Sequence, residues 1–286
     1  MANLNSLKGR IGVVSNTKKI TKAMQLVATA KLQKSRKEIQ NIKAYRDLIV
    51  ETFSELTKNI SRRDFESVFT LNYNQTKDLY IVISSDLGLC GAYNSNVYAQ
   101  MQKHIQPDDL FIFVGAKAYV YWHNKVASEQ IVQKYLSFGD KFTYALSESI
   151  SKDALELYFA NKIRSIKIIY TEFVNNITQD ARIVTLFPFD LPEKAIENNL
   201  KAEVEFLPNA EIILRNSIPL YISSMIYALG SSSKMSEMAS RRNAMENATD
   251  NAEELIKDLG LEYNRKRQSL ITQEITEIVS GADATN

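Results

Sequence analysis

The feature that most constrains this chain is its N-terminal region, which contains no proline from Leu4 to Ile60. Alternate steps of three and four residues meet apolar side chains at twelve of seventeen positions, the heptad pattern of a coiled coil. These seam positions are Leu4, Leu7, Ile11, Val14, Lys18, Thr21, Gln25, Ala28, Leu32, Ser35, Ile39, Ile42, Arg46, Ile49, Phe53, Leu56 and Ile60. At about 1.5 Å per residue, such a helix would be roughly 80 Å long. It cannot bury its stripe against one compact domain, so it needs a long partner helix.

The C-terminal region, from Glu211 to Val279, supplies a matching helical pattern. Its apolar stripe includes Met238, Met245, Ala248, Ala252, Leu255, Leu259, Tyr263, Leu270, Ile271, Ile275 and Ile278. Pro219 predicts a kink or interruption near its start. Gly230 and the serines Ser231–Ser233 predict a further weak point. Two long stripes at opposite ends of one chain predict an antiparallel coiled coil, with its seam loosened where polar residues cluster at positions 18 to 25.

The middle of the chain has a different texture, in which short β-rich runs alternate with helical stretches. The expected strands are Leu79–Ser84, Leu110–Val114, Ile166–Tyr170 and Ile183–Phe187. The expected helices are Ala92–His104, Ala116–Asn124 and Lys141–Lys162. This alternation predicts a largely parallel sheet. The fold class is therefore mixed α+β: a coiled coil of the terminal helices, residues 1–62 and 208–286, around a central Rossmann-like α/β domain, residues 75–192.

Residue usage excludes several kinds of site. Cys90 is the only cysteine, so no internal disulfide is possible, and this suits a reducing compartment. With only His104 and His123 as histidines, a metal site is not expected, and no cofactor is predicted. Apolar runs such as Leu79–Ile83 are far shorter than the roughly 20 residues of a membrane helix, so no membrane span is predicted.

The N-terminal helix has a strongly one-sided charge. Nine basic residues and no acidic ones occur before Glu38. Such an arm is typical of proteins that bind nucleic acid, a membrane surface or an acidic protein, although a solvated helix face is the ordinary explanation. Aromatic residues are absent before Tyr45, so the stacking surfaces of a single-strand binder are missing. An acidic protein partner fits this pattern best, and nucleic-acid binding is not expected.

The loop Ser84–Asn96 follows the first expected strand and opens a helix, the place where a doubly wound domain binds phosphate. It has Gly88 and Gly91 but neither of the usual phosphate-binding glycine motifs. Cys90 would need a nearby base to act as a nucleophile, so a buried structural thiol is the simpler interpretation. A stand-alone α/β nucleotide-binding enzyme, with helical arms for dimerisation, remains an alternative hypothesis.

Three long motifs resemble the gamma subunit, or central rotor shaft, of F-type ATP synthases. MANLNSLKGRIGVVSNTKKITKAMQLVATAKL is similar to the family's opening helix, and SSDLGLCGAYNSN to the loop after its first strand. ATDNAEELIKDLGLEYNRKRQSLITQEITEIVSGA is similar to its C-terminal helix. The resemblance covers both ends and the start of the middle, whereas residues from about 106 to 165 contribute little to it.

The resemblance implies a non-catalytic rotor subunit that couples rotation to conformational change at the catalytic sites of a hexamer of alpha and beta subunits. ATP synthesis is thereby coupled to proton or other ion transport. Its further partners would be the epsilon subunit and the membrane rotor ring. The complex would lie at the cytoplasmic face of the cell membrane as a peripheral assembly. A divergent F-type-like ATPase whose rotor is not coupled to ion translocation is the alternative within this class.

The resemblance also implies a set of residues that contact the hexamer or couple it to the rotor. They are Lys18, Lys19, Lys22, Met24, Arg241, Gln268 and Thr272. The three lysines would face acidic beta residues, and Met24 would lie near the acidic lever loop of beta, although plain coiled-coil packing explains a methionine there equally well. Arg241 matches an arginine implicated in coupling. Gln268 and Thr272 match positions that hydrogen-bond to a loop of the hexamer.

Five positions depart from the family pattern. Leu87 stands where a basic residue is common, and Ala92 where glycine is common. Glu246 replaces a usually basic residue, and Arg242 and Asn243 replace usually apolar or neutral ones. Such changes are tolerable if their contact partners have changed with them.

Overall fold

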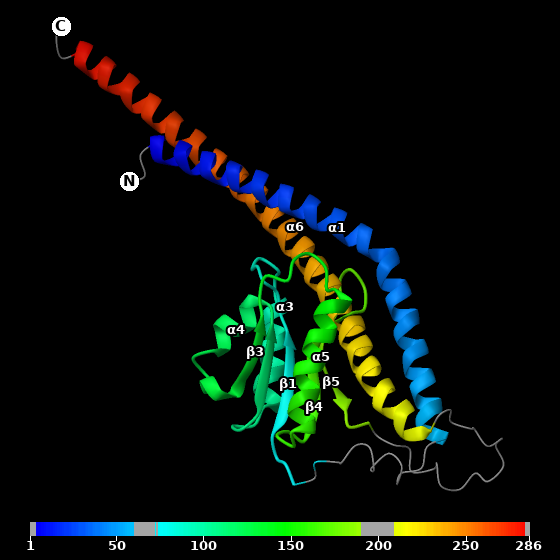
Figure 1. Cartoon of the computed structure of the whole chain (residues 1–286). Coiled ribbons are helices and arrows are strands. Elements are labelled where there is room, and N and C mark those ends of the chain that lie inside the picture. The colour runs from blue at the N-terminus through cyan, green and yellow to red at the C-terminus, as the bar shows by residue number, and fades with distance from the viewer. Residues whose placement is uncertain (1–3, 60–71, 73, 190–208, 284–286) are drawn as a thin grey trace. The chain divides into compact units, whose positions relative to one another are not determined.

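Two long helices and a five-stranded sheet make up the computed structural model, which describes residues 4–59, 72, 74–189 and 209–283 (Figure 1). The N-terminal helix α1 spans Leu4–Asn59, and the C-terminal helix α6 spans Ala210–Asp283. The predicted fold class is confirmed. Seam position Ile60 and the predicted boundaries at residues 62, 192 and 208 lie outside the described residues.

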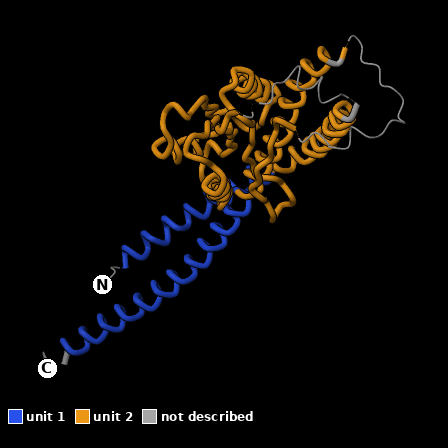
Figure 2. The backbone as a smooth tube through the Cα atoms, turned by 90° about the horizontal axis from the view of Figure 1, so that it is seen from below, with its two compact units in different colours: residues 1–29, 241–286 blue, residues 30–240 orange. Residues whose placement is uncertain are grey.

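The chain divides into two compact units, and each long helix contributes to both. Residues 1–29 and 241–286 form one, called here the coiled-coil unit, and residues 30–240 form the other, the globular unit (Figure 2). All sixteen described seam positions of α1 are buried or half-buried, as the heptad pattern predicts.

In the coiled-coil unit, the two helices run antiparallel, and both chain ends lie at the same end of the unit (Figure 2). The hydroxyl of Thr249 donates to the hydroxyl oxygen of Thr21 at 2.8 Å. Lys18, one turn earlier on α1, forms an ion pair at 3.1 Å with Glu253, one turn later on α6. Thr21 and Gln25 are only 9% and 8% exposed. The burial of Thr21 and Gln25 contradicts the prediction of a loosened seam: Lys18 and Thr21 make polar contacts across it, whereas Oε1 of Gln25 is buried without a hydrogen-bond partner among the described residues.

Helix α6 is continuous through the two places where the sequence predicted interruption. Pro219 lies inside the helix, where the flanking residues Ile218 and Ile222 are fully buried and hold the turn in place. Gly230 marks a close contact, because a Cβ atom there would lie 2.5 Å from the ring of Phe142. Tertiary packing thus outweighs the low helix propensity of both residues.

The sheet has the strand order β3-β2-β1-β4-β5. Its strands are β1 Asp78–Ile83, β2 Leu110–Val114, β3 Ile131–Tyr135, β4 Ser165–Phe173 and β5 Gln179–Phe187. The β1–β2, β1–β4 and β2–β3 pairs are parallel, and β4–β5 is antiparallel. The largely parallel sheet was predicted, together with four of these strands. The strand β3, at one edge, was not.

Helices cover both faces of the sheet, so the central strands are buried on both faces. One face packs against α3, Tyr93–His104, and α4, Ala116–Trp122. The other packs against α5, Tyr144–Phe159, and the first part of α6. A short 3-10 helix, Ser128–Gln130, precedes β3.

The first part of α6 explains an apolar stretch that passes a simple test for a membrane helix. Within the described residues, one helix has the length and composition to cross a bilayer, with a mean hydropathy of 1.3. Half of that stretch is buried inside the protein. Its hydrophobic side chains include Leu214, Ile218 and Ile226, which belong to the sheet-facing core. The packing of the globular unit thus accounts for this composition.

Candidate functional site

The end of α6 extends beyond the pairing with α1. The register fixed by Thr21 and Thr249 brings the first described residue of α1, Leu4, level with the region of Lys266. From Arg267 to Gly281, every residue of α6 is exposed. This overhang presents five large apolar side chains, which are Leu270, Ile271, Ile275, Ile278 and Val279, at 39%, 46%, 57%, 71% and 54% exposure. Within the described residues, this half of the predicted C-terminal stripe has no partner helix.

Two of the predicted contact residues, Gln268 and Thr272, lie on this overhang. Both are exposed, and the Thr272 hydroxyl donates to the Gln268 carbonyl oxygen at 3.0 Å, one helical turn away. The Gln268 side chain is therefore accessible to solvent. The overhang therefore combines an apolar stripe with exposed polar groups.

The other predicted residues lie at two more levels along the coiled-coil unit. Lys19 and Lys22 are exposed on α1, and Met24 is half-buried. Arg241 is half-buried at the start of the α6 portion. The structure therefore does not gather the seven residues into one cluster but spreads them along the coil.

Lys18 has a partner inside its own chain. Its ammonium group pairs with the Glu253 carboxylate, and this contact lowers the pKa of Glu253. Part of the charge on Lys18 is thus matched within its own chain, and its contact with acidic residues of another subunit stays a prediction. Lys19 and Lys22 are the predicted lysines that the fold leaves exposed.

The two unusual charges on α6 compensate each other. Arg242 and Glu246 form an ion pair at 3.2 Å, four residues apart on the helix. Each of these two charged residues thus has a partner of opposite charge one helical turn away. Ala92 is similarly accounted for, since its φ of −83° and ψ of 2° do not require glycine. Leu87 is 72% exposed, and nothing in the structure explains its substitution.

The loop after β1 is held by hydrogen bonds from within the chain. The Asp86 carboxylate accepts from the backbone N–H of Ala116, at the start of α4, at 3.1 Å, and from that of Ser137 at 2.9 Å. The Ser84 hydroxyl oxygen accepts from the N–H of Ala118 at 3.0 Å. The backbone N–H groups of Ala116 and Ala118, at the start of α4, are therefore already bonded to side chains of the loop after β1.

Cys90 is a buried thiol, 2% exposed, within the same loop. The side-chain amide of Asn94 donates to its sulfur at 3.2 Å. Both histidine rings contact carbonyls of their own helices: His104 Nδ1 lies 3.0 Å from the Gln100 oxygen and His123 Nδ1 lies 2.9 Å from the Val120 oxygen. These contacts support the interpretation of Cys90 as a structural residue.

The place where a doubly wound sheet binds ligands is filled by α6. The strand order reverses between β1 and β4, and ligands of such sheets bind at the carboxyl ends of the two strands at this point. Here the Ser233 hydroxyl lies 2.8 Å from the Tyr93 hydroxyl at the start of α3, and it accepts from the Thr171 N–H of β4 at 3.0 Å. Sequence reasoning missed this contact. The run of small residues at Gly230–Ser233 was its signal, since small side chains permit close approach.

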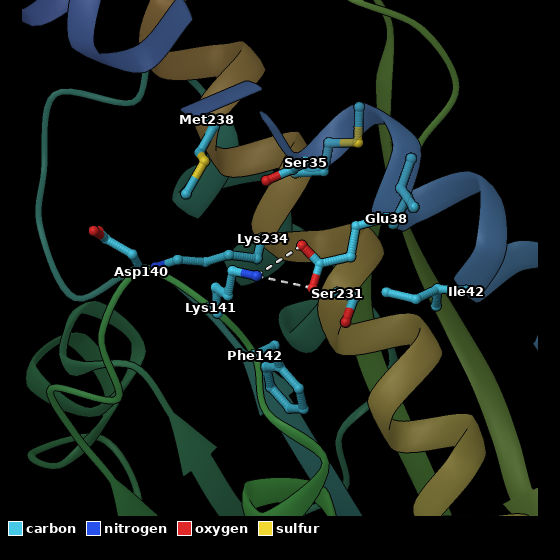
Figure 3. Close-up of a pocket in the computed structure, with 11 residues that line it drawn as sticks. Ser35, Glu38, Ile42, Asp140, Lys141, Phe142, Ser231, Lys234 and Met238 are labelled. Atoms are coloured by element: carbon cyan, nitrogen blue, oxygen red, sulfur yellow. Dashed lines mark hydrogen bonds and ion pairs between the residues drawn. The ribbon is translucent and has the colours of Figure 1, made fainter. Parts of the chain in front are cut away.

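Within the globular unit, the loop between β3 and α5 contacts the part of α1 that belongs to this unit. The Lys141 ammonium donates to both carboxylate oxygens of Glu38, at 3.0 and 2.9 Å (Figure 3), and Lys31 pairs with Asp140. The adjacent cavity is about 40 Å³, lined in part by Met238, and has room for little more than one water molecule. Within the described residues, no cluster of His, Cys, Asp or Glu side chains could hold a metal ion.

Comparisons with known proteins assign the family. The family model described as ATP synthase matches residues 3–285. An ATP synthase gamma chain of Mycoplasmopsis synoviae is 49% identical over 100% of both chains. A second, from Mycoplasma capricolum, is 42% identical over 99% of both. The chain belongs to the ATP synthase gamma-chain family. The predicted function, a gamma subunit of an F-type ATP synthase, is confirmed by this membership.

Solved structures show the same fold at lower sequence identity. A chain of the Euglena gracilis mitochondrial ATP synthase, solved as OSCP/F1/c-ring, has a TM-score of 0.71 at 20% identity, covering 99% of this chain and 94% of that one. A chain of the Tetrahymena thermophila central stalk and c-ring has a TM-score of 0.64 at 22% identity, with 80% and 99% covered. The same fold therefore persists where most residues differ.

Proposed function

We propose that this gamma-family chain is a non-catalytic rotating shaft whose overhang turns inside a hexamer of alpha and beta subunits. The observation that carries the proposal is the apolar stripe from Leu270 to Val279, which is exposed on a helix that has no partner helix in the described part of the chain. Exposed apolar patches of this kind mark surfaces that bind other proteins. The exposed Lys19 and Lys22 supply positive charge for acidic beta residues at a second level of the coil.

The filled crevice of the sheet supports the non-catalytic part of the proposal. Ser233 lies in the crevice where a doubly wound α/β domain would hold its ligand, and Asp86 is bonded to the N–H of Ala116 at the start of the neighbouring helix α4. The epsilon subunit and the membrane rotor ring would bind the globular unit, at the cytoplasmic face of the cell membrane. Nucleotide chemistry would then occur only in the hexamer.

A shaft of this kind acts by differential contact. A ligand or subunit that binds two conformations equally well shifts neither population. The overhang and the coil must therefore touch each beta subunit differently at each angle. Exposed apolar side chains on the overhang and exposed lysines on α1 would provide such differences in contact.

Removing Leu270–Asn286 is expected to reduce ATP-driven proton pumping by the reconstituted complex by about tenfold or more. Each large apolar side chain buried in the hexamer would contribute about 1.5–3 kcal/mol, and the deletion removes several. ATP hydrolysis and proton uptake into vesicles would be measured on the same preparation. The matched control is Glu274→Gln/Glu277→Gln, which changes the polar side of the overhang and should retain pumping.

Unchanged hydrolysis and pumping after the deletion would count against a functional contact between the overhang and the hexamer. The wild-type complex in the same assay also separates the two F-type hypotheses. Hydrolysis that moves protons supports the ion-coupled synthase, whereas hydrolysis without proton movement identifies a rotor that is not coupled to ion flow.

The purified chain is expected to show no saturable binding of ATP. Its sheet crevice and the first backbone N–H groups of α4 are occupied by its own side chains. Isothermal titration with Mg-ATP provides the measurement, and the assembled hexamer serves as the positive control. Saturable binding by the isolated chain would favour the alternative of an α/β nucleotide-binding enzyme.

A further inference from the structure

Strand β4 continues past the end of its neighbour β1. The β1–β4 pairing ends where Val82 pairs with Ile169, yet β4 extends to Phe173. Alternate residues of a strand direct their N–H and C=O groups to the same edge. Thr171 and Phe173 therefore present theirs to the edge that β1 has left. They are only 1% and 9% exposed, so these backbone groups need partners within the protein.

Three serines of α6 provide those partners. The N–H of Thr171 donates to the Ser233 hydroxyl oxygen, and the N–H of Phe173 donates to that of Ser232, both at 3.0 Å. The Ser236 hydroxyl donates to the Thr171 carbonyl oxygen, also at 3.0 Å. The helix thus completes the edge of the sheet in place of β1. Covering an edge with a helix is a known way to satisfy it.

The three serines lie on one face of α6 and are almost fully buried. Ser232 is 7% exposed, and Ser233 and Ser236 are at 0%. The spacings of three and four residues bring them together on successive turns. The Tyr93 hydroxyl, 2.8 Å from the Ser233 hydroxyl, adds a contact from α3. The same helix face is therefore bonded to both elements that border the crevice.

Hydrogen bonds constrain a helix differently from apolar contacts. The hydrophobic effect is non-directional, so an apolar face tolerates small rotations and slides. Hydrogen bonds weaken steeply once their angles depart from linear. Bonds from one face of α6 to fixed backbone groups of β4 therefore oppose rotation of the helix about its own axis. They also oppose sliding along the strand.

We propose that Ser232, Ser233 and Ser236 fix the angle of α6 relative to the sheet and thereby transmit torque between the globular unit and the shaft. The inference rests on the proposed function, because it requires that the chain rotates. The serines act as positioning residues and take no part in the chemistry. Helix α6 is continuous in sequence from these serines to the overhang.

The test is a single-molecule rotation measurement on the reconstituted hexamer, with a bead attached to the globular unit. Torsional stiffness follows from the angular fluctuations of the bead while the motor waits for ATP. The Ser232→Ala/Ser233→Ala/Ser236→Ala variant should show angular variance at least about twofold larger than wild type. Its rotation rate at saturating ATP should be unchanged, because the overhang is intact.

Ser231→Ala is the matched control, since Ser231 lies on the same turn but lines the small cavity facing Phe142. Its variance should equal that of wild type. Should the triple variant fail to assemble, Ser236→Ala alone is used. It removes one hydrogen-bond donor and leaves Ser232 and Ser233 as acceptors, so it should increase the angular variance by a smaller factor. Wild-type variance in an assembled triple or single variant overturns the torque role of the serines. Absence of ATP-driven rotation in wild type itself sinks the proposed function, and the inference with it.

Discussion

Replacing Gly115 with alanine is expected to lower the free energy of unfolding of the globular unit by about 3–4 kcal/mol. Gly115 has a φ of 95° and a ψ of 142°, a backbone region that residues with side chains rarely adopt. A Cβ atom there would also lie 2.3 Å from the Ser84 carbonyl oxygen, a backbone atom that cannot turn aside. Urea unfolding followed by the fluorescence of Trp122, the only tryptophan, would measure the loss.

Gly139→Ala separates the two causes of that loss. Gly139 also has a positive φ, of 88°, but no atom lies within 4 Å of the place where its Cβ would stand. Only backbone strain should arise there, with a cost of about 1 kcal/mol. Equal costs for the two variants would contradict the steric part of the argument.

Asp78→Asn is expected to destabilise the globular unit by about 3 kcal/mol. The Asp78 side chain is 3% exposed and accepts two hydrogen bonds from Arg164, at 3.0 and 2.7 Å, and one from Lys167 at 2.7 Å. The Ser165 hydroxyl also donates to it at 2.8 Å. Neutralising the carboxylate leaves two cations without their shared partner at the amino end of β1.

The same urea experiment measures this loss, and Asp108→Asn is the control, because Asp108 is exposed on the neighbouring loop. A loss below about 1 kcal/mol would mean that solvent replaces the carboxylate as a partner for Arg164 and Lys167.

The cost of Asp78→Asn should depend on pH in a defined direction. Burial opposes ionisation of Asp78, but the hydrogen bonds from Arg164, Lys167 and Ser165 outweigh it and lower the pKa below its ordinary value of 3.8. A lowered carboxyl pKa stabilises the fold above the unfolded pKa, and this contribution is lost as the pH falls through the folded one. The difference between wild type and variant should therefore be constant near neutrality and shrink below about pH 4. A difference that grew on acidification would contradict this assignment.

Burial also raises the pKa of the neighbouring Asp109. That carboxyl contributes in the opposite sense, since its protonation on acidification favours the folded state. Comparing wild type with the Asp78 variant at each pH is therefore more informative than the pH profile of wild type alone.

Periodicity predicted the elements that bury a regular stripe. The expected helix from Leu4 and the strand Leu110–Val114 agree with α1 and β2 because their apolar patterns are long or uninterrupted. The edge strand Ile131–Tyr135 was missed because it is half exposed and includes Gln133 and Lys134. At an edge, a strand needs few apolar residues, so the pattern that identifies central strands is weak there.

The errors on α6 share one physical cause. Rules for helix breakers weigh each residue locally, whereas Gly230 and the serines that follow are placed by contacts with Phe142 and with β4. The need for small or polar side chains at these positions becomes visible only when their neighbours in the folded structure, Phe142 and β4, are known. The pairing of Lys18 with Glu253 was hidden for the same reason, because the register of two helices over 200 residues apart is not visible in either one.

The occupation of the sheet crevice by α6 has a consequence for competition. A segment of the same chain meets its binding place at an effective concentration that is high and constant, about millimolar or above for a tethered partner. Dissolved ATP would have to displace a helix that is covalently attached and built into the core around Ile226. The dimensions of this part of the rotor are therefore independent of how much nucleotide the cell contains. The packing of α6 in the sheet crevice is then the same at low and at high ATP concentration.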